Sequence, residues 1–187
     1  MTACSLVSSI LVLLAGCPAA PVTYSAPVGI SLHAKSSDAT NGLVTDDKRI
    51  STEQGNPYGA FVSEAKAQLA GRTPTAIVVE GAQLSLGDGS SGVTSLADVF
   101  GGNVAIDFLI DDSNNSFGVA NAVVDGTVAD AIELDPHFDS GALSEFDYVK
   151  LLGGHFTVVA RGTAARGFAD KGASGDLDVT LTFAAFE

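Results

Sequence analysis

The sequence predicts a mainly β protein, an antiparallel β-sandwich or jelly-roll-like domain with one packed α-helix. Three observations lead to this fold class. Apolar and polar residues alternate in about seven short segments separated by Gly, Asn and Asp turn signals, which is typical of half-buried strands. One segment has apolar residues at helical spacing and capping residues at both ends. The chain has 187 residues, of which 46% are hydrophobic, which is enough apolar material for the core of one domain. We place this domain over residues 28–187.

The first predicted strand covers residues 28–35, where Val28, Ile30 and Leu32 alternate with small or polar residues. Residues 36–54 are polar, so we expect a long loop there, with a short hairpin around Gly42. Further strands are expected over residues 75–86, 104–110, 117–124 and 148–161, the last with a bulge or bend at Gly153-Gly154. The final strand has the most regular alternation, with Leu177, Val179, Leu181 and Phe183 pointing inward.

The single predicted helix covers residues 57–70. Asn56 can cap its first turn, and Pro57 suits the first helical position because the N–H that it lacks would be unpaired there. Gly71 can end the helix in a left-handed conformation. Apolar side chains at helical spacing form one face, which we expect to pack on the sheet. They are Tyr58, Phe61, Val62, Ala65 and Leu69.

An apolar run near the amino terminus has the length of the hydrophobic part of a signal peptide. Residues 10–14 are all Ile, Leu or Val, and the run is too short to span a bilayer as a helix. It leads into Leu14-Ala15-Gly16-Cys17, which resembles the lipobox of bacterial lipoproteins. This resemblance implies that residues 1–16 are a signal peptide and that the Cys17 sulfur carries a diacylglyceryl membrane anchor. Pro18 after the cysteine implies, by the same resemblance, the outer membrane of the bacterial cell envelope.

Residues 17–27 are predicted to be a tether between the anchor and the domain, because they contain three prolines and cannot continue a helix. The other cysteine, Cys4, would leave with the signal peptide, so no disulfide is expected. The alternative is that residues 5–15 form a buried helix and that Cys17 is an ordinary core thiol. Residues 1–34 contain no Lys or Arg, whereas a secretory signal usually begins with positive charge.

Acidic residues outnumber basic ones, and the formal net charge is −13. This charge argues against nucleic acid as a partner, because phosphate neutralisation needs Lys and Arg. No basic residue lies between Arg72 and Lys150, whereas thirteen acidic residues do. In that segment Asp111, Asp112 and Asn114 follow a predicted strand and offer oxygen ligands for a calcium ion, the one cofactor that the sequence suggests. The alternative is a solvated turn, since the EF-hand spacing is absent.

The sequence contains none of the common catalytic motifs, and we predict no catalytic residue. The Gly-x-Ser-x-Gly, His-Glu-x-x-His and phosphate-loop patterns are all missing. We therefore expect a lipid-anchored envelope protein with a non-enzymatic interaction or structural role, whose partner is an envelope protein or a polysaccharide. The alternatives are a calcium-dependent module that binds carbohydrate or peptide, and a hydrolase that uses carboxylates distant in sequence.

Overall fold

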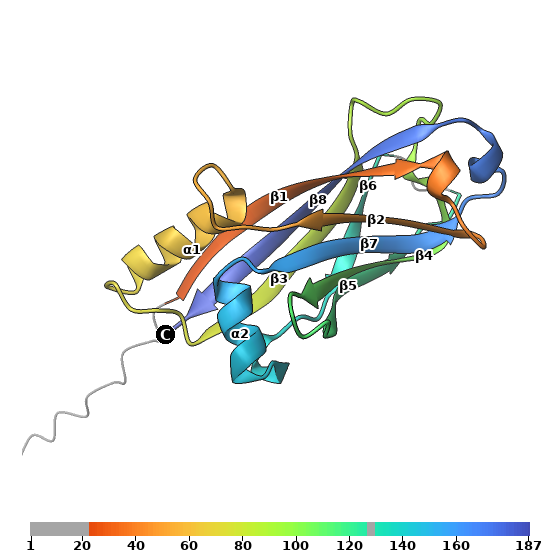
Figure 1. The fold of residues 1–187 in the computed structure, drawn as a ribbon. Coiled ribbons are helices and arrows are strands. Elements are labelled where there is room, and N and C mark those ends of the chain that lie inside the picture. The colour runs from red at the N-terminus through yellow and green to blue at the C-terminus, as the bar shows by residue number, and fades with distance from the viewer. Residues whose placement is uncertain (1–22, 127–129) are drawn as a thin grey trace, which may run out of the picture.

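The computed structural model describes residues 23–126 and 130–187, which form eight strands and two α-helices (Figure 1). The strands are β1 (Thr23–Lys35), β2 (Leu43–Arg49), β3 (Ala76–Leu86), β4 (Phe100–Ile110), β5 (Ser116–Val123), β6 (Ala131–Pro136), β7 (Phe156–Ala164) and β8 (Ser174–Phe186). The helices are α1 (Pro57–Gln68) and α2 (Glu145–Leu152). The predicted fold class, mainly antiparallel β with a packed helix, is confirmed.

The strands form one antiparallel sheet in the order β1-β8-β3-β6-β5-β4-β7-β2. The sheet curls until its edge strands β1 and β2 face each other, so it is nearly closed (Figure 1). Near the β1–β2 turn, the backbone N–H of His33 donates to the Asp46 carboxylate at 2.7 Å. Nearer the start of β1, a cavity of about 210 Å³ lies between the two edge strands. It is lined by residues 28–31 of β1 and by residues 48–50, which form the end of β2 and the residue after it. The seam is therefore closed by side chains rather than by a strand ladder.

The core lies inside the curled sheet, because alternate side chains of the strands point inward. β8 lies between β1 and β3 and buries all four residues that its alternation predicted, from Leu177 to Phe183. Aromatic rings gather around Phe108, whose ring centroid is 4.8 Å from that of Phe156 and 4.9 Å from that of Phe138. This aromatic group joins β4, β7 and β8 to the segment that follows β6.

The predicted helix is confirmed as α1, which ends at Gln68. The Asn56 side chain accepts a hydrogen bond from the Tyr58 backbone N–H at 3.0 Å, and Gly71 has a left-handed φ of +84°. Tyr58 and Phe61 are buried and reach the aromatic group of the core. The helix therefore packs its predicted apolar face against the sheet near the start of β1.

The strand predicted over residues 148–161 is wrong in its first half. Residues 145–152 form α2, and β7 begins only at Phe156. The Ser144 hydroxyl accepts a hydrogen bond from the Asp147 backbone N–H at 3.1 Å and caps this helix. Gly154, at a φ of +69°, turns the chain from α2 into β7 instead of forming a bulge within a strand. A short apolar run fits both a strand and a helix, so its alternation was ambiguous.

The long loop predicted over residues 36–54 contains a strand, β2, which pairs with β7 along its whole length. Its alternation is hidden because Asp46 and Lys48 lie on the same side of the strand as the buried Val44. Charged residues on the inward side are typical of an edge strand, where they oppose pairing with another chain.

The first strand begins five residues earlier than predicted, so residues 23–27 of the expected tether belong to β1 and pair with β8. Pro27 is tolerated in this strand because of its position at the sheet edge. The N–H of His33 points toward β2, and every second residue of a strand has the same orientation. The nitrogen of Pro27 therefore faces the seam. On that side β1 has no paired strand to which a backbone N–H would donate a hydrogen bond, so the missing N–H costs nothing.

Candidate functional site

One end of the curled sheet carries α1, α2, the loop of residues 111–115 and the start of β1 at Thr23, and we call it the helix end (Figure 1). Two phenols hold it together. The Tyr58 hydroxyl donates to the Leu151 carbonyl at 3.0 Å, which joins α1 to α2, and the Tyr148 hydroxyl donates to the Pro74 carbonyl at 2.7 Å. Burial raises the pKa of Tyr148 to about 12 and that of Tyr58 further, so both phenols remain hydrogen-bond donors at neutral pH.

The predicted calcium ligands lie at the helix end, and two of them are bound to basic side chains. Arg49 Nη2 lies 2.6 Å from Asp111 Oδ2, and the Lys150 ammonium donates to the Asp112 carboxylate. The Lys150 contact is the main cause of a lowered pKa of Asp112. Asn114 has a positive φ of 55°, and its backbone N–H bonds back to the end of β4 at 3.1 Å. These contacts close the turn between β4 and β5.

The acidic loops do not converge on one place. Asp88-Gly89-Ser90 follows β3 at the end of the sheet opposite to Asp111 and Asp112. In the part of the chain that the structure describes, no three His, Cys, Asp or Glu side chains are grouped so that they could hold a metal ion. Calcium binding stays a prediction of the sequence, and we do not propose it.

Asp147 is a buried carboxylate at the helix end that the sequence analysis did not single out. It is 2% exposed, and its Oδ2 accepts hydrogen bonds from the Ser144 hydroxyl at 2.9 Å and from the Asn115 amide at 3.0 Å. The neighbouring Ser113 hydroxyl and the Asn115 amide lower the pKa of Asp147. The carboxylate therefore fixes α2 to the loop between β4 and β5. The spacing Ser144-x-x-Asp147 was the signal in the sequence, because it is typical of a capping box.

Replacing Asp147 with Asn is expected to lower stability at neutral pH but not in acid. The folded protein holds the Asp147 pKa below its usual value near 3.9, so the ionised carboxylate stabilises the fold above about pH 4. This contribution is lost as the pH falls toward the folded-state pKa. Urea unfolding should give a lower midpoint for Asp147→Asn at pH 7, and the gap to the wild type should narrow progressively as the pH falls below 4.

The matched control for this prediction is Glu145→Gln, which removes one negative charge from the same turn of α2 at an exposed position. We expect little change in its midpoint at either pH. An Asp147→Asn variant as stable at pH 7 as the control would contradict the assigned role of the carboxylate.

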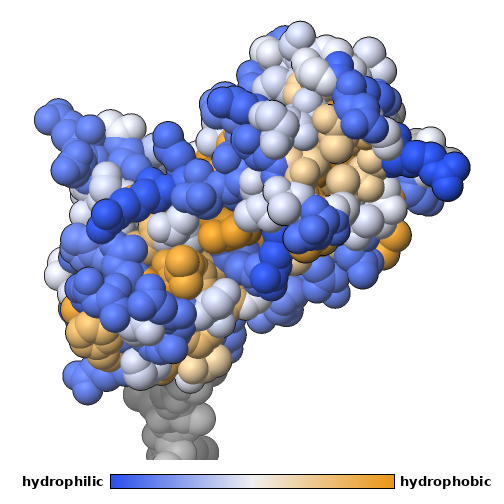
Figure 2. All heavy atoms as spheres, turned by 45° about the vertical axis from the view of Figure 1, so that its right-hand side comes forward, coloured by the Kyte–Doolittle hydropathy of each residue, from blue (hydrophilic) through white to orange (hydrophobic). Residues whose placement is uncertain are grey.

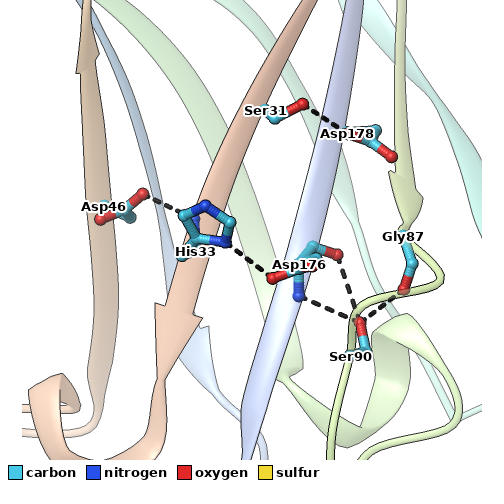
Figure 3. A network of polar contacts seen from close by, with 7 residues as sticks. All are labelled: Ser31, His33, Asp46, Gly87, Ser90, Asp176 and Asp178. Atoms are coloured by element: carbon cyan, nitrogen blue, oxygen red, sulfur yellow. Dashed lines mark hydrogen bonds and ion pairs between the residues drawn. The ribbon is translucent and has the colours of Figure 1, made fainter.

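A second polar network lies at the opposite end of the sheet, on the outer face of β1 and β8 (Figure 3). His33 Nδ1 lies 2.7 Å from Asp176 Oδ1, and the Ser31 hydroxyl donates to Asp178 at 2.9 Å. Ser90 accepts a hydrogen bond from the Asp176 backbone N–H at 3.0 Å. The network therefore joins β1, β8 and the loop after β3, which gives these polar groups a structural role.

Four carboxylates of the acidic segment bind basic side chains from outside it. In addition to the two pairs at the helix end, Arg161 Nη2 lies 2.9 Å from Asp107 Oδ2, and Lys171 Nζ lies 2.9 Å from Asp98 Oδ1. Lys171 is the main cause of a strongly lowered pKa of Asp98. The charge that is segregated along the sequence is thus partly neutralised in the fold, because distant strands become neighbours.

Cys17, the predicted lipidation site, lies outside the described residues, so its modification stays a prediction. No helix within residues 23–126 and 130–187 is long and apolar enough to cross a membrane. No protein-family model matches the sequence, and no curated protein matches it.

Proposed function

We propose that the protein is a lipoprotein of the bacterial cell envelope, anchored in the outer membrane through Cys17, with a non-enzymatic interaction or structural role. The observation that carries this proposal is the position of the first strand. β1 begins at Thr23, six residues after the lipobox cysteine, and the strands and helices that follow bury a core of their own. Processing at Cys17 would therefore leave the folded domain intact behind a short tether.

The use of the polar side chains supports a role in binding or structure rather than in catalysis. Asp111 and Asp112 bind Arg49 and Lys150, and Asp147 fixes α2 to the loop between β4 and β5. The His33–Asp176 pair joins two strands. These carboxylates and His33 are thus engaged in contacts between elements of the fold. The partner we propose is another envelope protein or a polysaccharide.

Replacing Cys17 with Ser in the full-length chain is expected to abolish retention in the membrane fraction of a bacterial host that processes lipoproteins. The wild type should partition into detergent, and mass spectrometry should find a mature protein that begins at an acylated Cys17. Cys4→Ser is the matched control, because it removes the same side chain from the predicted signal peptide and should leave retention unchanged. A mature protein that begins elsewhere, or that carries a free thiol at Cys17, would contradict the proposal.

A further inference from the structure

The outer face of α2 carries two large apolar side chains that are exposed, Phe146 at 54% and Val149 at 61%. They are three residues apart, so they lie on one side of the helix, away from the buried Asp147 and Leu151. The Lys150 ammonium lies 5.4 Å from the centre of the Phe146 ring. Apolar residues also reach the surface among hydrophilic ones in the view of Figure 2. Phe146 and Val149, which we call the apolar pair, are the exposed large apolar residues of the helix end.

The apolar pair lies close to the point where the chain enters the sheet. Thr23 pairs with Phe186 across β1 and β8, and the Thr75 backbone N–H donates to the Phe186 carbonyl at 2.9 Å. The preceding residue, Pro74, accepts the hydrogen bond from Tyr148 of α2. Two strand spacings of about 5 Å each therefore separate Thr23 from Thr75. The Tyr148 hydroxyl of α2 reaches the residue before Thr75. Figure 1 shows α2 and the start of β1 at the same end of the molecule.

The distance from Cys17 to this end is limited by the covalent chain. Thr23 is the sixth residue after Cys17, so five residues lie between them. Even a fully extended chain of that length spans no more than about 20 Å. A lipid on Cys17 would therefore keep the helix end within about 20 Å of the bilayer surface. The opposite end, with the exposed Leu43, is separated from Thr23 by the length of the 13-residue strand β1, about 40 Å.

We propose that the apolar pair inserts into the interfacial layer of the bilayer that holds the Cys17 lipid, so that the protein stands on the membrane with its helix end. This inference rests on the lipid anchor proposed above. Because the anchor keeps the local concentration of α2 at the surface high, a weak apolar contact is sufficient. Lys150 can lie along the headgroups while its ammonium stays in water. With a net charge of −13, the contact depends on apolar burial rather than on attraction to anionic lipids.

The absence of Trp from the sequence allows a direct test. Phe146→Trp is expressed from the full-length chain in a host that processes lipoproteins, and the purified product is reconstituted into phosphatidylcholine vesicles. Its fluorescence is compared with that of Leu43→Trp prepared in the same way, an exposed apolar position at the opposite end. The reference sample is the same variant after enzymatic removal of its anchor segment, dissolved in detergent-free buffer. We expect the indole introduced at 146 to emit at shorter wavelength on vesicles than in this reference. Lipids brominated on their acyl chains should quench it, while the indole at 43 should be unaffected. Adding phosphatidylglycerol should not strengthen the quenching.

Flotation of the vesicles separates the two proposals. If both variants float with lipid but the indole at 146 is not quenched, the anchor stands and the apolar pair does not insert. If neither variant floats, the lipid anchor is wrong and this inference falls with it. A third outcome is an emission wavelength at 146 that changes with protein concentration and is not quenched by brominated lipid. It would show that the apolar pair contacts a second copy of the chain, which also overturns the inference.

Discussion

Leu181→Asp is expected to prevent folding of the domain. Leu181 is fully buried on β8, which lies between β1 and β3 in the sheet. Losing a buried leucine side chain costs about 2–5 kcal/mol, and an unpaired buried carboxylate adds several more. Their sum is comparable to the whole stability of a typical domain, about 5–15 kcal/mol. Circular dichroism in the near ultraviolet and dispersion of amide NMR signals should both be lost.

Thr180→Asp is the control for this substitution, because Thr180 is the next residue of β8 and faces the other side of the sheet. Its cross-strand neighbours, Gly29 and Gln83, are uncharged. We expect this variant to fold and to unfold cooperatively, with a change in stability of about 1 kcal/mol or less. A cooperative unfolding transition in Leu181→Asp would show that burial of Leu181 on β8 is not needed for the core to form.

Phe108→Ala is expected to lower the free energy of unfolding by about 3–5 kcal/mol, the usual cost of removing a buried aromatic side chain. Phe108 is fully buried, and its ring contacts Phe138, Phe156 and Phe183, which come from three other parts of the chain. The variant would leave a cavity where these parts meet. Urea unfolding followed by circular dichroism measures the loss.

Phe117→Ala serves as the comparison, since Phe117 lies directly across from Phe108 on β5 but is only half-buried. We expect its cost to be about 1–2 kcal/mol, because part of its ring is in contact with water in the folded state. Equal losses for the two substitutions would argue against a core centred on Phe108.

The fold class and most of the elements could be predicted from local patterns. Strict alternation in β8 and the capping residues of α1 act within a few residues of the chain, so they can be read without knowing the neighbours. β2 was missed because its inward side carries Asp46 and Lys48, a feature of its place at the sheet edge. α2 was missed because Val149 and Leu151 fit a strand and a helix equally well.

The candidate site was predictable only in part. The positions of Asp111, Asp112 and Asn114 after a strand were predicted correctly, since β4 ends at Ile110. That Arg49 and Lys150 bind the two carboxylates was not predictable, because these partners are 62 and 38 residues away along the chain. An ion pair between such distant residues depends on strand order, which no local pattern encodes.

The sequence alone determined the lipobox resemblance and the acidic segment. The short spacing from Cys17 to the first strand came from the structure, because the sequence predicted that strand to begin only at residue 28. Only the tertiary structure brought α2 beside the start of β1. That proximity depends on β8, whose end at Phe186 pairs with Thr23 on one side and contacts Thr75 on the other. Residues 23, 75, 148 and 186 are far apart in sequence, and their meeting follows from burying one shared core. The exposed apolar pair thus acquires its position at the helix end from the sheet, not from its own segment.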